Sequence, residues 1–257
     1  MTTETKTKLP KFQGKPLIET PDVVSSANFL EGDFGKVVHN EVVAEYGPDN
    51  PFVTSDVSYN DEDNVVRGSK PGYAVAVNKV LREDERILRT ATPADLERIS
   101  RVKALPLRGQ YEDSALVLRS EDEPNKYLAK NLIKQVKARN PKAKMPVMIP
   151  LCGLELVKDS DSPHNSLSFK LREDAEIIYA HILNKDSACF VSEDIDKKTG
   201  LPTKLGKEGR YFCTINSGLS RLVLGRGLVL DSYWGDLAYS VGYGRVVVVS
   251  AEGASQK

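Results

Sequence analysis

Cysteine and histidine have the widest chemistry of the residues in this sequence, but their spacing indicates no reaction. Cys152, Cys189 and Cys213 lie far apart and belong to no CxxC or Cys/His pattern, so neither a zinc site nor a disulfide framework is indicated. The three histidines have no partner at the spacing of a base, a metal ligand or a catalytic triad. The sequence also contains no Gly-rich phosphate loop, no HExxH and no GxSxG. We therefore expect a protein that is not an enzyme and has no metal and no cofactor.

Two acidic segments resemble calcium-binding motifs in part. The segment from Asp194 to Gly200 is similar to a calcium loop, but Lys198 stands at the fifth position and no glutamate closes the loop. Glu123-Pro124-Asn125 coincides with a tripeptide that many sugar-binding lectins use at calcium, and Trp234-Gly235-Asp236 resembles their second element. These two elements lie more than a hundred positions apart. Because oxygen ligands must converge on one ion, we expect turns here and not a metal site.

Residues 216–250 combine a regular hydrophobic framework with an irregular set of other residues. The framework consists of Leu222, Leu224, Leu228, Leu230, Leu237 and Ala238. Its spacing is typical of a buried scaffold. The residues between these positions follow no physical order, so we expect their side chains to be exposed. Tyr and Trp among them would supply a large contact area at a low cost in conformational entropy, as in antibody loops.

The composition of this stretch is also unusual. Residues 223–249 contain no Lys, Glu, Gln or Met, although Lys and Glu are plentiful elsewhere. Replacing the two adenines of an Asn codon (AAC or AAT) at random can give Gly, Arg, Val, Asp, Tyr, Ser, Leu or Ala, but none of those four residues and not Trp. Trp234 is the departure from this rule. The composition therefore favours a stretch rewritten by adenine-directed mutagenesis.

The stretch resembles the variable region of proteins diversified by diversity-generating retroelements. The resemblance is carried by Leu-Ser-Arg-Leu at 219–222, by the alternation from 224 to 243, by Leu237-Ala238 and by the closing segment from Gly244 to Val249. Upstream, only the order of elements is compatible. The resemblance implies a C-type lectin-like fold, in which a rigid antiparallel scaffold displays variable side chains on one solvent-facing surface. It also implies that this surface binds a variable target, usually a protein.

The resemblance assigns the variable, ligand-binding positions by their place in the stretch. They are Gly225, Arg226, Gly227, Val229, Asp231, Tyr233, Trp234, Gly235, Asp236, Tyr239, Val241, Gly242 and Tyr243. Val223 is a further candidate. Because Trp234 departs from the codon rule, it is either a fixed residue of the site or the product of another codon.

The elements that must position this surface follow from hydrophobic periodicity and helix signals. Thr92-Pro93-Ala94-Asp95 predicts a helix start, and residues 126–139 predict a second helix that ends at Asn140. Short strands are expected at 37–38, 42–43, 52–53 and 73–78, and again at 147–151, 154–157, 167–171, 177–183 and 211–215. This pattern predicts an α+β fold with two helices and short antiparallel strands.

Prolines divide the first part of the chain into short apolar pieces. Pro10, Pro16 and Pro21 predict that residues 1–40 form an N-terminal arm packed on the domain. The lectin-like domain is then expected at 41–257, with its variable region at about 219–250. The polar stretch Met1 to Lys8 carries no secretory signal, which predicts synthesis in the cytoplasm. Association with a virion or a cell surface is left open.

Charge and hydropathy limit the classes of partner. The chain of 257 residues has 36 basic and 36 acidic side chains, so its zero net charge creates no global field for nucleic acid. No run approaches the roughly 18 apolar residues of a membrane helix.

Two alternatives to target binding stay open: a nucleic-acid-binding protein that uses the basic segment 126–144, and an enzyme on a formylglycine-generating-like scaffold. The second would require paired, reactive cysteines.

Overall fold

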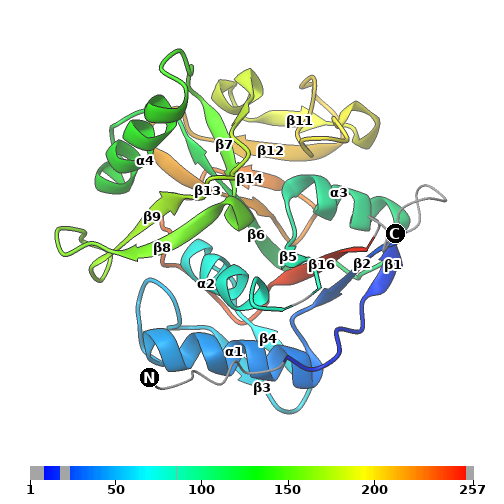
Figure 1. Ribbon diagram of the computed structural model, residues 1–257. Coiled ribbons are helices and arrows are strands. Elements are labelled where there is room, and N and C mark those ends of the chain that lie inside the picture. Colours follow the sequence, from blue (N-terminus) through cyan, green and yellow to red (C-terminus); the bar gives the residue numbers. More distant parts are fainter. Residues whose placement is uncertain (1–8, 18–23, 85, 253–257) are drawn as a thin grey trace, which may run out of the picture.

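The computed structural model describes residues 9–17, 24–84 and 86–252 of the chain (Figure 1). Their fold is mixed α+β, with four α-helices and several β-sheets. The helices are α1 (Gly32–Tyr46), α2 (Pro71–Leu81), α3 (Pro93–Val102) and α4 (Lys126–Arg139). Among the described residues, none of these helices has both the length and the apolarity needed to cross a membrane.

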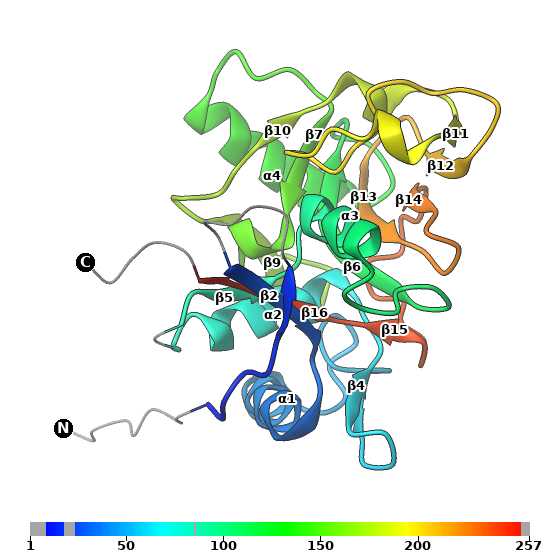
Figure 2. The ribbon, with the colours of Figure 1, turned by 90° about the vertical axis from the view of Figure 1, so that its right-hand side faces the viewer.

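One sheet joins the two ends of the chain. Its strands, in spatial order, are β1 (Lys15–Leu17), β2 (Val24–Phe29), β16 (Val247–Glu252) and β5 (Leu88–Thr90). The last strand, β16, pairs antiparallel with both β2 and β5, so it lies inside the sheet (Figure 2). Val246 and Val248 belong to one hydrophobic core, whereas Val247 and Val249 belong to a second core.

A larger sheet carries the predicted variable region. Its path is β10 (Ile178–Tyr179), β7 (Val147–Pro150), β6 (Tyr111–Leu118), β13 (Leu219–Leu224), β14 (Leu230–Ser232), β12 (Arg210–Thr214) and β11 (Ala188–Phe190). The short strand β15 (Gly244–Arg245) runs parallel to β6. Because every residue of β6 and β13 is buried, these two strands form the rigid centre of the sheet.

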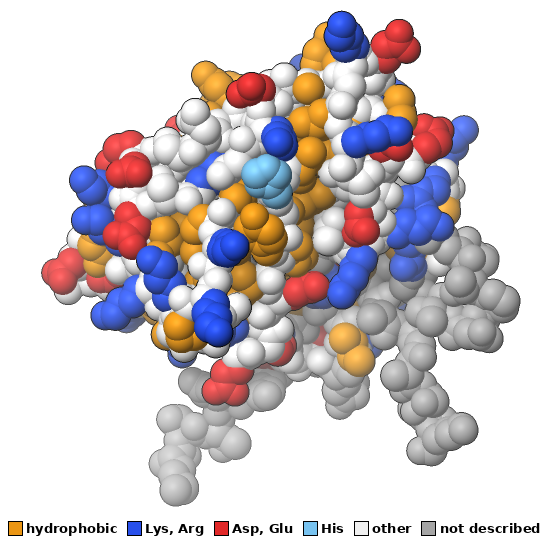
Figure 3. Space-filling model, turned by 90° about the horizontal axis from the view of Figure 1, so that it is seen from above, with side chains coloured by type: hydrophobic (Ala, Val, Ile, Leu, Met, Phe, Trp, Pro, Cys, Tyr) orange, Lys and Arg blue, Asp and Glu red, His pale blue; other side chains and the backbone are white. Residues whose placement is uncertain are grey.

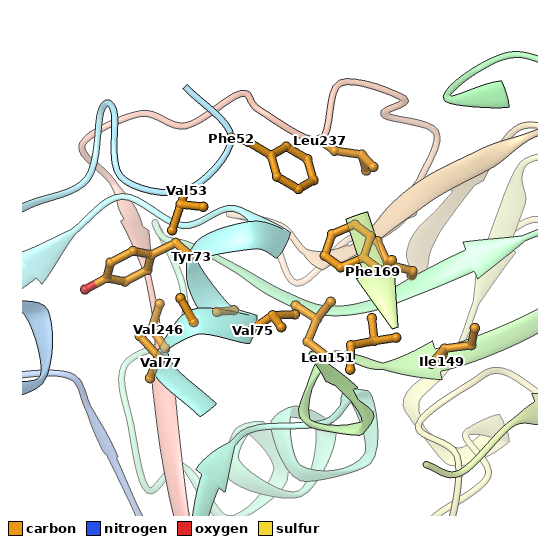
Figure 4. Packing of buried hydrophobic residues seen from close by; sticks show 14 of the residues in the cluster. Phe52, Val53, Tyr73, Val75, Val77, Ile149, Leu151, Phe169, Leu237 and Val246 are labelled. Atoms are coloured by element: carbon orange, nitrogen blue, oxygen red, sulfur yellow. The ribbon is translucent and has the colours of Figure 1, made fainter. Parts of the chain in front are cut away.

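Two hairpins complete the fold, β3 (Ser58–Asn60) with β4 (Val65–Arg67) and β8 (Leu154–Lys158) with β9 (Leu167–Leu171). The largest core cluster takes residues from α1, α2 and α4 and from several strands. Leu237 and Val246, from the segment after β14, also belong to this cluster, and Figure 4 shows Leu237 near Phe52 and Phe169. The framework of the predicted variable region is therefore tied to the main core.

The two helices expected from capping and periodicity are confirmed. Thr92 and Asp95 form a capping box at the start of α3, in which each side chain satisfies a backbone N–H of the other residue. In α4, Leu128, Leu132 and Val136 are among the buried residues, and Asn140 caps the helix as predicted. The strands expected at 147–151, 154–157, 167–171 and 211–215 correspond to β7, β8, β9 and β12.

Four of the expected strands are wrong. The expected strand 73–78 is the middle of α2, the pieces at 37–38 and 42–43 lie in α1, and residues 52–53 lie in a turn. Nearly all of α2 is buried, so its sequence shows no polar face, and periodicity cannot separate a short buried helix from a buried strand. The fold therefore has two helices more than predicted. Only residues 178–179 of the expected strand 177–183 are extended, and a 3₁₀ turn follows at 181–184.

The first forty residues take part in regular structure. β2 forms six backbone pairs with β16, and residue 40 lies inside α1, so the expected boundary at 40 falls within a helix. Residues 1–8 and 18–23 lie outside the described residues. This applies to the Met1 to Lys8 segment that the expectation about a secretory signal concerns, and to part of the predicted arm.

Candidate ligand-binding surface

The predicted variable residues lie mostly on two loops that follow the central strands β13 and β14 of the larger sheet. Residues 225–229 join β13 to β14, and residues 233–243 join β14 to β15; together we call them the C-terminal loops. They lie on the right-hand side of Figure 2. Backbone hydrogen bonds from Gly109 N to Arg226 O (2.9 Å) and from Tyr111 N to Tyr243 O (3.4 Å) connect them to the start of β6.

Burial separates the predicted variable positions from the framework. None of the thirteen predicted positions is buried; eight are exposed and five are partly exposed. Of the framework residues, Leu222, Leu224, Leu230 and Leu237 are buried, and Leu228 and Ala238 are partly buried. The aromatic side chains do not fill the core, because Tyr233 is 59% exposed and Trp234 is 52% exposed.

The C-terminal loops surround a pocket of about 210 Å³. Seven of its ten lining residues are predicted site residues: Gly225, Arg226, Asp231, Trp234, Tyr239, Val241 and Tyr243. The other three are Tyr111, Arg221 and Val223. The fold therefore brings together seven predicted residues from the nineteen-residue stretch 225–243. Tyr111 of β6 forms a further part of the pocket wall.

Aromatic stacking and one carboxylate order the rim of the pocket. The rings of Trp234 and Tyr239 stack with an interplanar angle of 7° and a centroid distance of 6.0 Å. Asp231 accepts hydrogen bonds from Tyr233 N (2.8 Å) and Trp234 Nε1 (2.9 Å). Burial raises the pKa of the Asp231 carboxyl, while these two hydrogen bonds act in the opposite direction. The stacked pair thus stands on the surface in a defined orientation.

A cationic side chain faces the second aromatic group. The guanidinium of Arg226 lies 4.6 Å from the ring centroid of Tyr243, within the range of a cation–π interaction. Tyr243 in turn meets Tyr111 edge-on, with ring centroids 5.7 Å apart. The loop 225–229 and the end of the loop 233–243 are therefore joined by side chains as well as by backbone contacts.

A buried polar network forms the floor of the pocket. Arg221 donates to Asp113 Oδ2 (2.5 Å) and to the carbonyl oxygen of Tyr239 (2.6 Å). Ser69 Oγ donates to the same Asp113 oxygen (2.8 Å), and the Tyr111 hydroxyl donates to Ser69 O (2.9 Å). These bonds link β6, β13, the loop 233–243 and the segment before α2 that contains Ser69, so the floor is held from four parts of the chain.

Sequence reasoning missed Tyr111, Arg221 and Asp113. Arg221 was noted within Leu-Ser-Arg-Leu only as part of the resemblance. A charged residue inside a strand that is otherwise buried was the signal that could have marked it, because such a residue requires a partner. Asp113 carries the same signal, because it is a charged residue inside the buried strand β6. Tyr111 gives no such signal, and it lies more than a hundred positions before the loops that it supports.

The glycines of the C-terminal loops are not equivalent. A Cβ atom on Gly242 would have nothing within 4 Å, and on Gly225 and Gly227 it would make only ordinary contacts. A Cβ on Gly235 would lie 2.6 Å from Cβ of Pro124. Gly235 therefore differs from the other predicted variable glycines in having a neighbour that a side chain would displace.

The two lectin-like elements lie next to each other in the structure, contrary to the expectation from their separation in the sequence. Asn125 Nδ2 donates to Gly235 O (2.5 Å) and to Leu219 O (2.7 Å). This amide is therefore occupied by backbone carbonyls of the loop and of β13. Among the described residues, no group of three or more His, Cys, Asp or Glu side chains is arranged to hold a metal ion.

The residues required by the two alternatives are also placed. Cys152 follows β7, while Cys189 and Cys213 lie on the neighbouring strands β11 and β12, and all three thiols are free. Burial raises the pKa of the Cys152 and Cys213 thiols, which disfavours the reactive thiolate. The lysines of α4 are exposed, but on the face seen from above, basic and acidic side chains lie side by side (Figure 3).

The surface of the C-terminal loops thus combines exposed aromatic rings, one arginine and small residues on a buried scaffold. Its function has to be inferred from this geometry. Comparison with family models, with curated proteins and with solved structures found no match to this chain.

Proposed function

We propose that this chain is a ligand-binding display protein whose C-terminal loops are diversified by a retroelement. The ligand is a variable target, and we infer that it is a protein. The chain acts by binding and not by catalysis, with a C-type lectin-like domain as the scaffold.

The burial pattern is the observation that carries this proposal. The resemblance places the variable residues at thirteen positions, and all of them are at least partly exposed, while the four leucines Leu222, Leu224, Leu230 and Leu237 are buried. A surface that can change sequence without loss of the fold requires this separation. The exposed residues contribute little to packing, so replacing them changes stability by small amounts.

The architecture supports the lectin-like scaffold in two respects. The central strands β6, β13 and β14 are antiparallel neighbours, as a rigid antiparallel scaffold requires. The Glu-Pro-Asn and Trp-Gly-Asp elements, distant in sequence, meet where Asn125 donates to Gly235 O.

The side chains of the pocket suit a protein target. Trp, Tyr and Arg dominate the binding energy of protein interfaces, and here Trp234, Tyr239, Tyr243 and Arg226 border one concave site. The stacked and cation-paired rings are held in place before binding, which lowers the entropic cost of association.

The proposal is tested by randomising the exposed positions. A display library is made with NNC or NNT codons at Arg226, Gly227, Tyr233, Asp236, Tyr239, Gly242 and Tyr243, and it is selected against a panel of unrelated proteins. We expect most members to fold, as judged by resistance to protease, and specific binders to be recovered for several targets.

A control library randomises seven other exposed positions, so that the two libraries have the same size. These positions include Lys126, Lys130, Lys134 and Lys137 on α4. If the two libraries give binders at the same frequency, the C-terminal loops have no special role as a binding surface.

Genomic sequence supplies a separate test, of diversification by a retroelement. A near-copy of the sequence that encodes residues 219–250, with adenines at the variable codons, is expected beside a reverse transcriptase gene, and its absence would refute diversification.

A further inference from the structure

A larger cleft, separate from the C-terminal loops, lies between the end of α2, β5, the first half of α3 and the turn after β7. Its volume is about 660 Å³, which is within the range of sites for small organic molecules. Residues around 172–176 and 197–198 also line the cleft. Four separate stretches of the chain therefore contribute to it: 78–98, 150–153, 172–176 and 197–198.

The cleft has an excess of positive charge in a protein of zero net charge. Seven lining residues are basic: Arg82, Arg86, Arg89, Arg98, Arg172, Lys197 and Lys198. Four lining residues are acidic: Asp84, Asp95, Asp174 and Glu176. The local excess is thus three positive charges, and a concave wall concentrates the resulting field.

Three of the acidic groups are already occupied by arginine partners. Asp84 pairs with Arg86 (2.6 Å), Asp95 pairs with Arg89 (2.5 Å), and Asp174 pairs with Arg172 (2.9 Å). Asp95 also accepts the Thr92 N–H in the capping box of α3. These three carboxylates position three guanidinium groups in the wall of the cleft. The other cationic side chains of the cleft form no ion pair with these carboxylates.

Two further arginines have buried N–H groups that lack an acceptor. Among the described residues, neither Nη1 of Arg82 nor Nε of Arg98 has a hydrogen-bond partner, although both atoms are buried. Within the described part of the chain, the Arg98 side chain donates one long bond, from Nη2 to Leu17 O (3.4 Å). Both arginines line the cleft and are partly exposed, and protein acceptors satisfy them incompletely, so their guanidinium groups are open to an anion in the cleft.

Part of the remaining wall is apolar and suits an organic group. Leu81, Leu88 and Pro150 line the cleft, and Ile87, also a lining residue, is 67% exposed. Forked guanidinium groups match phosphate oxygens with two parallel hydrogen bonds, and lysines add point charges. A ligand with several phosphate groups would therefore pair with more of these cationic side chains than a ligand with a single carboxylate.

We propose that this cleft binds a small polyphosphate, with the phosphate groups held by Arg82, Arg98, Lys197 and Lys198. The ligand carries at least two phosphates, because four cationic side chains that form no ion pair with a carboxylate of the cleft line it and come from separate stretches of the chain. The source is either an organic polyphosphate such as a nucleoside triphosphate or an inorganic one. The site is independent of the C-terminal loops and of the function proposed for them.

The test is calorimetric titration of the full chain at about 0.15 M salt, where exposed charges are screened beyond roughly 8 Å. The probes are ATP, inorganic tripolyphosphate and adenosine. We expect ATP and tripolyphosphate to bind and adenosine not to bind. ATP binding at least tenfold tighter than tripolyphosphate assigns an organic ligand, and equal or weaker ATP binding assigns an inorganic polyphosphate.

Two double variants and a matched control locate the site. R82Q/R98Q is expected to weaken binding at least tenfold, and K197Q/K198Q at least threefold. The control K130Q/K134Q removes the same charge as K197Q/K198Q from exposed positions on α4 and is expected to change the affinity by less than twofold. Melting temperatures show whether each variant is folded. If R82Q/R98Q does not fold, the affinity of K197Q/K198Q alone decides the test.

Three results would overturn the proposal: no binding of either polyphosphate, adenosine binding as tightly as ATP, or an equal loss of affinity in K130Q/K134Q and K197Q/K198Q. The last result would mean that the protein attracts anions only through its overall surface charge.

Discussion

At the scale of single residues, the C-terminal loops contain positions that tolerate change and at least one that does not. Gly242 is exposed and has open space where a side chain would begin. Gly235 packs against the ring of Pro124 and accepts a hydrogen bond from Asn125 through its carbonyl oxygen. We therefore expect Gly235 to be a fixed contact between the loop 233–243 and the start of α4.

Gly235→Ala is predicted to lower the free energy of unfolding by about 1–3 kcal/mol, the usual cost of forcing a group into a packed contact. Gly242→Ala serves as the matched control, with an expected change of at most about 0.5 kcal/mol. Neither glycine has a positive φ, so the comparison measures space alone. Urea denaturation gives both values, and equal effects would contradict the distinction.

Glu112 is a second single residue with a measurable consequence. It is 1% exposed, and neither carboxyl oxygen has a hydrogen-bond partner among the described residues. Burial raises the pKa of Glu112 well above its ordinary value, the charge of Asp113 adds to this, and Arg245 opposes it. The folded state thus favours the protonated form.

The expected pH dependence follows from this direction. Below the unfolded pKa, near 4.5, both states are protonated and the full stability is present. As the pH rises from there toward the raised folded pKa, stability falls by up to about 1.4 kcal/mol per pH unit. Glu112→Gln removes the ionisation, so the variant should melt above the parent at pH 7 and close to it at pH 4. A melting temperature below that of the parent at pH 7 would contradict this.

At the scale of elements, a buried arginine joins the strands that carry the C-terminal loops. Arg119, at the end of β6, donates to Ser220 Oγ on β13 (2.9 Å), to Ser232 Oγ on β14 (2.7 Å) and to Thr214 Oγ1 on β12 (2.8 Å). Burial lowers its pKa to about 10. One side chain therefore ties four strands together, which gives the loops a rigid base.

Replacing Tyr233, Tyr239 and Tyr243 together by alanine is predicted to shift the melting temperature by only a few degrees. All three are more than two-fifths exposed, so little buried area is lost. Leu230→Ala, in β14, is the contrasting change, because Leu230 is 2% exposed and its removal should cost about 2–5 kcal/mol. Thermal denaturation of both variants tests the division between scaffold and surface. A large loss of stability in the triple variant would assign these tyrosines to the core.

At the scale of the whole molecule, β16 joins parts of the chain that are far apart in sequence. It pairs with β2 and β5, and its alternate side chains enter two different cores. The segment that ends the predicted variable region is therefore continuous with a strand that stabilises both cores. The C-terminal loops, which lie between β13 and β16, are thus flanked on both sides by buried strands.

Val248→Ala and Val249→Ala are each predicted to cost about 2–3 kcal/mol, from two buried methyl groups and the cavity they leave. Val248 is 0% exposed in the larger core, and Val249 is 3% exposed in the second core. Both should reduce stability to a similar degree because β16 is buried on both faces. If only one of them does so, the strand supports a single core. Chemical denaturation distinguishes these cases.

Features that depend on local pattern could be predicted from the sequence. The helix start at Thr92 and the apolar stripe of α4 depend on contacts within a few residues, so they were predicted correctly. The alternation of leucines with small, polar and aromatic residues predicted the exposure of the thirteen site positions, but Val223, Ser232 and Ser240, which lie between the framework residues, are buried. The untested part of that hypothesis, target binding, still rests on the resemblance and on this exposure.

Features that depend on distant contacts could not be predicted from local patterns. The helix α2 is buried on nearly all sides, which hid its period, and the site residues Tyr111 and Asp113 act on loops more than a hundred positions later. The charged cleft is assembled from four separate stretches of the chain that meet only in the folded structure. Sequence patterns report a residue's own burial, whereas convergence in space is set by how the elements pack.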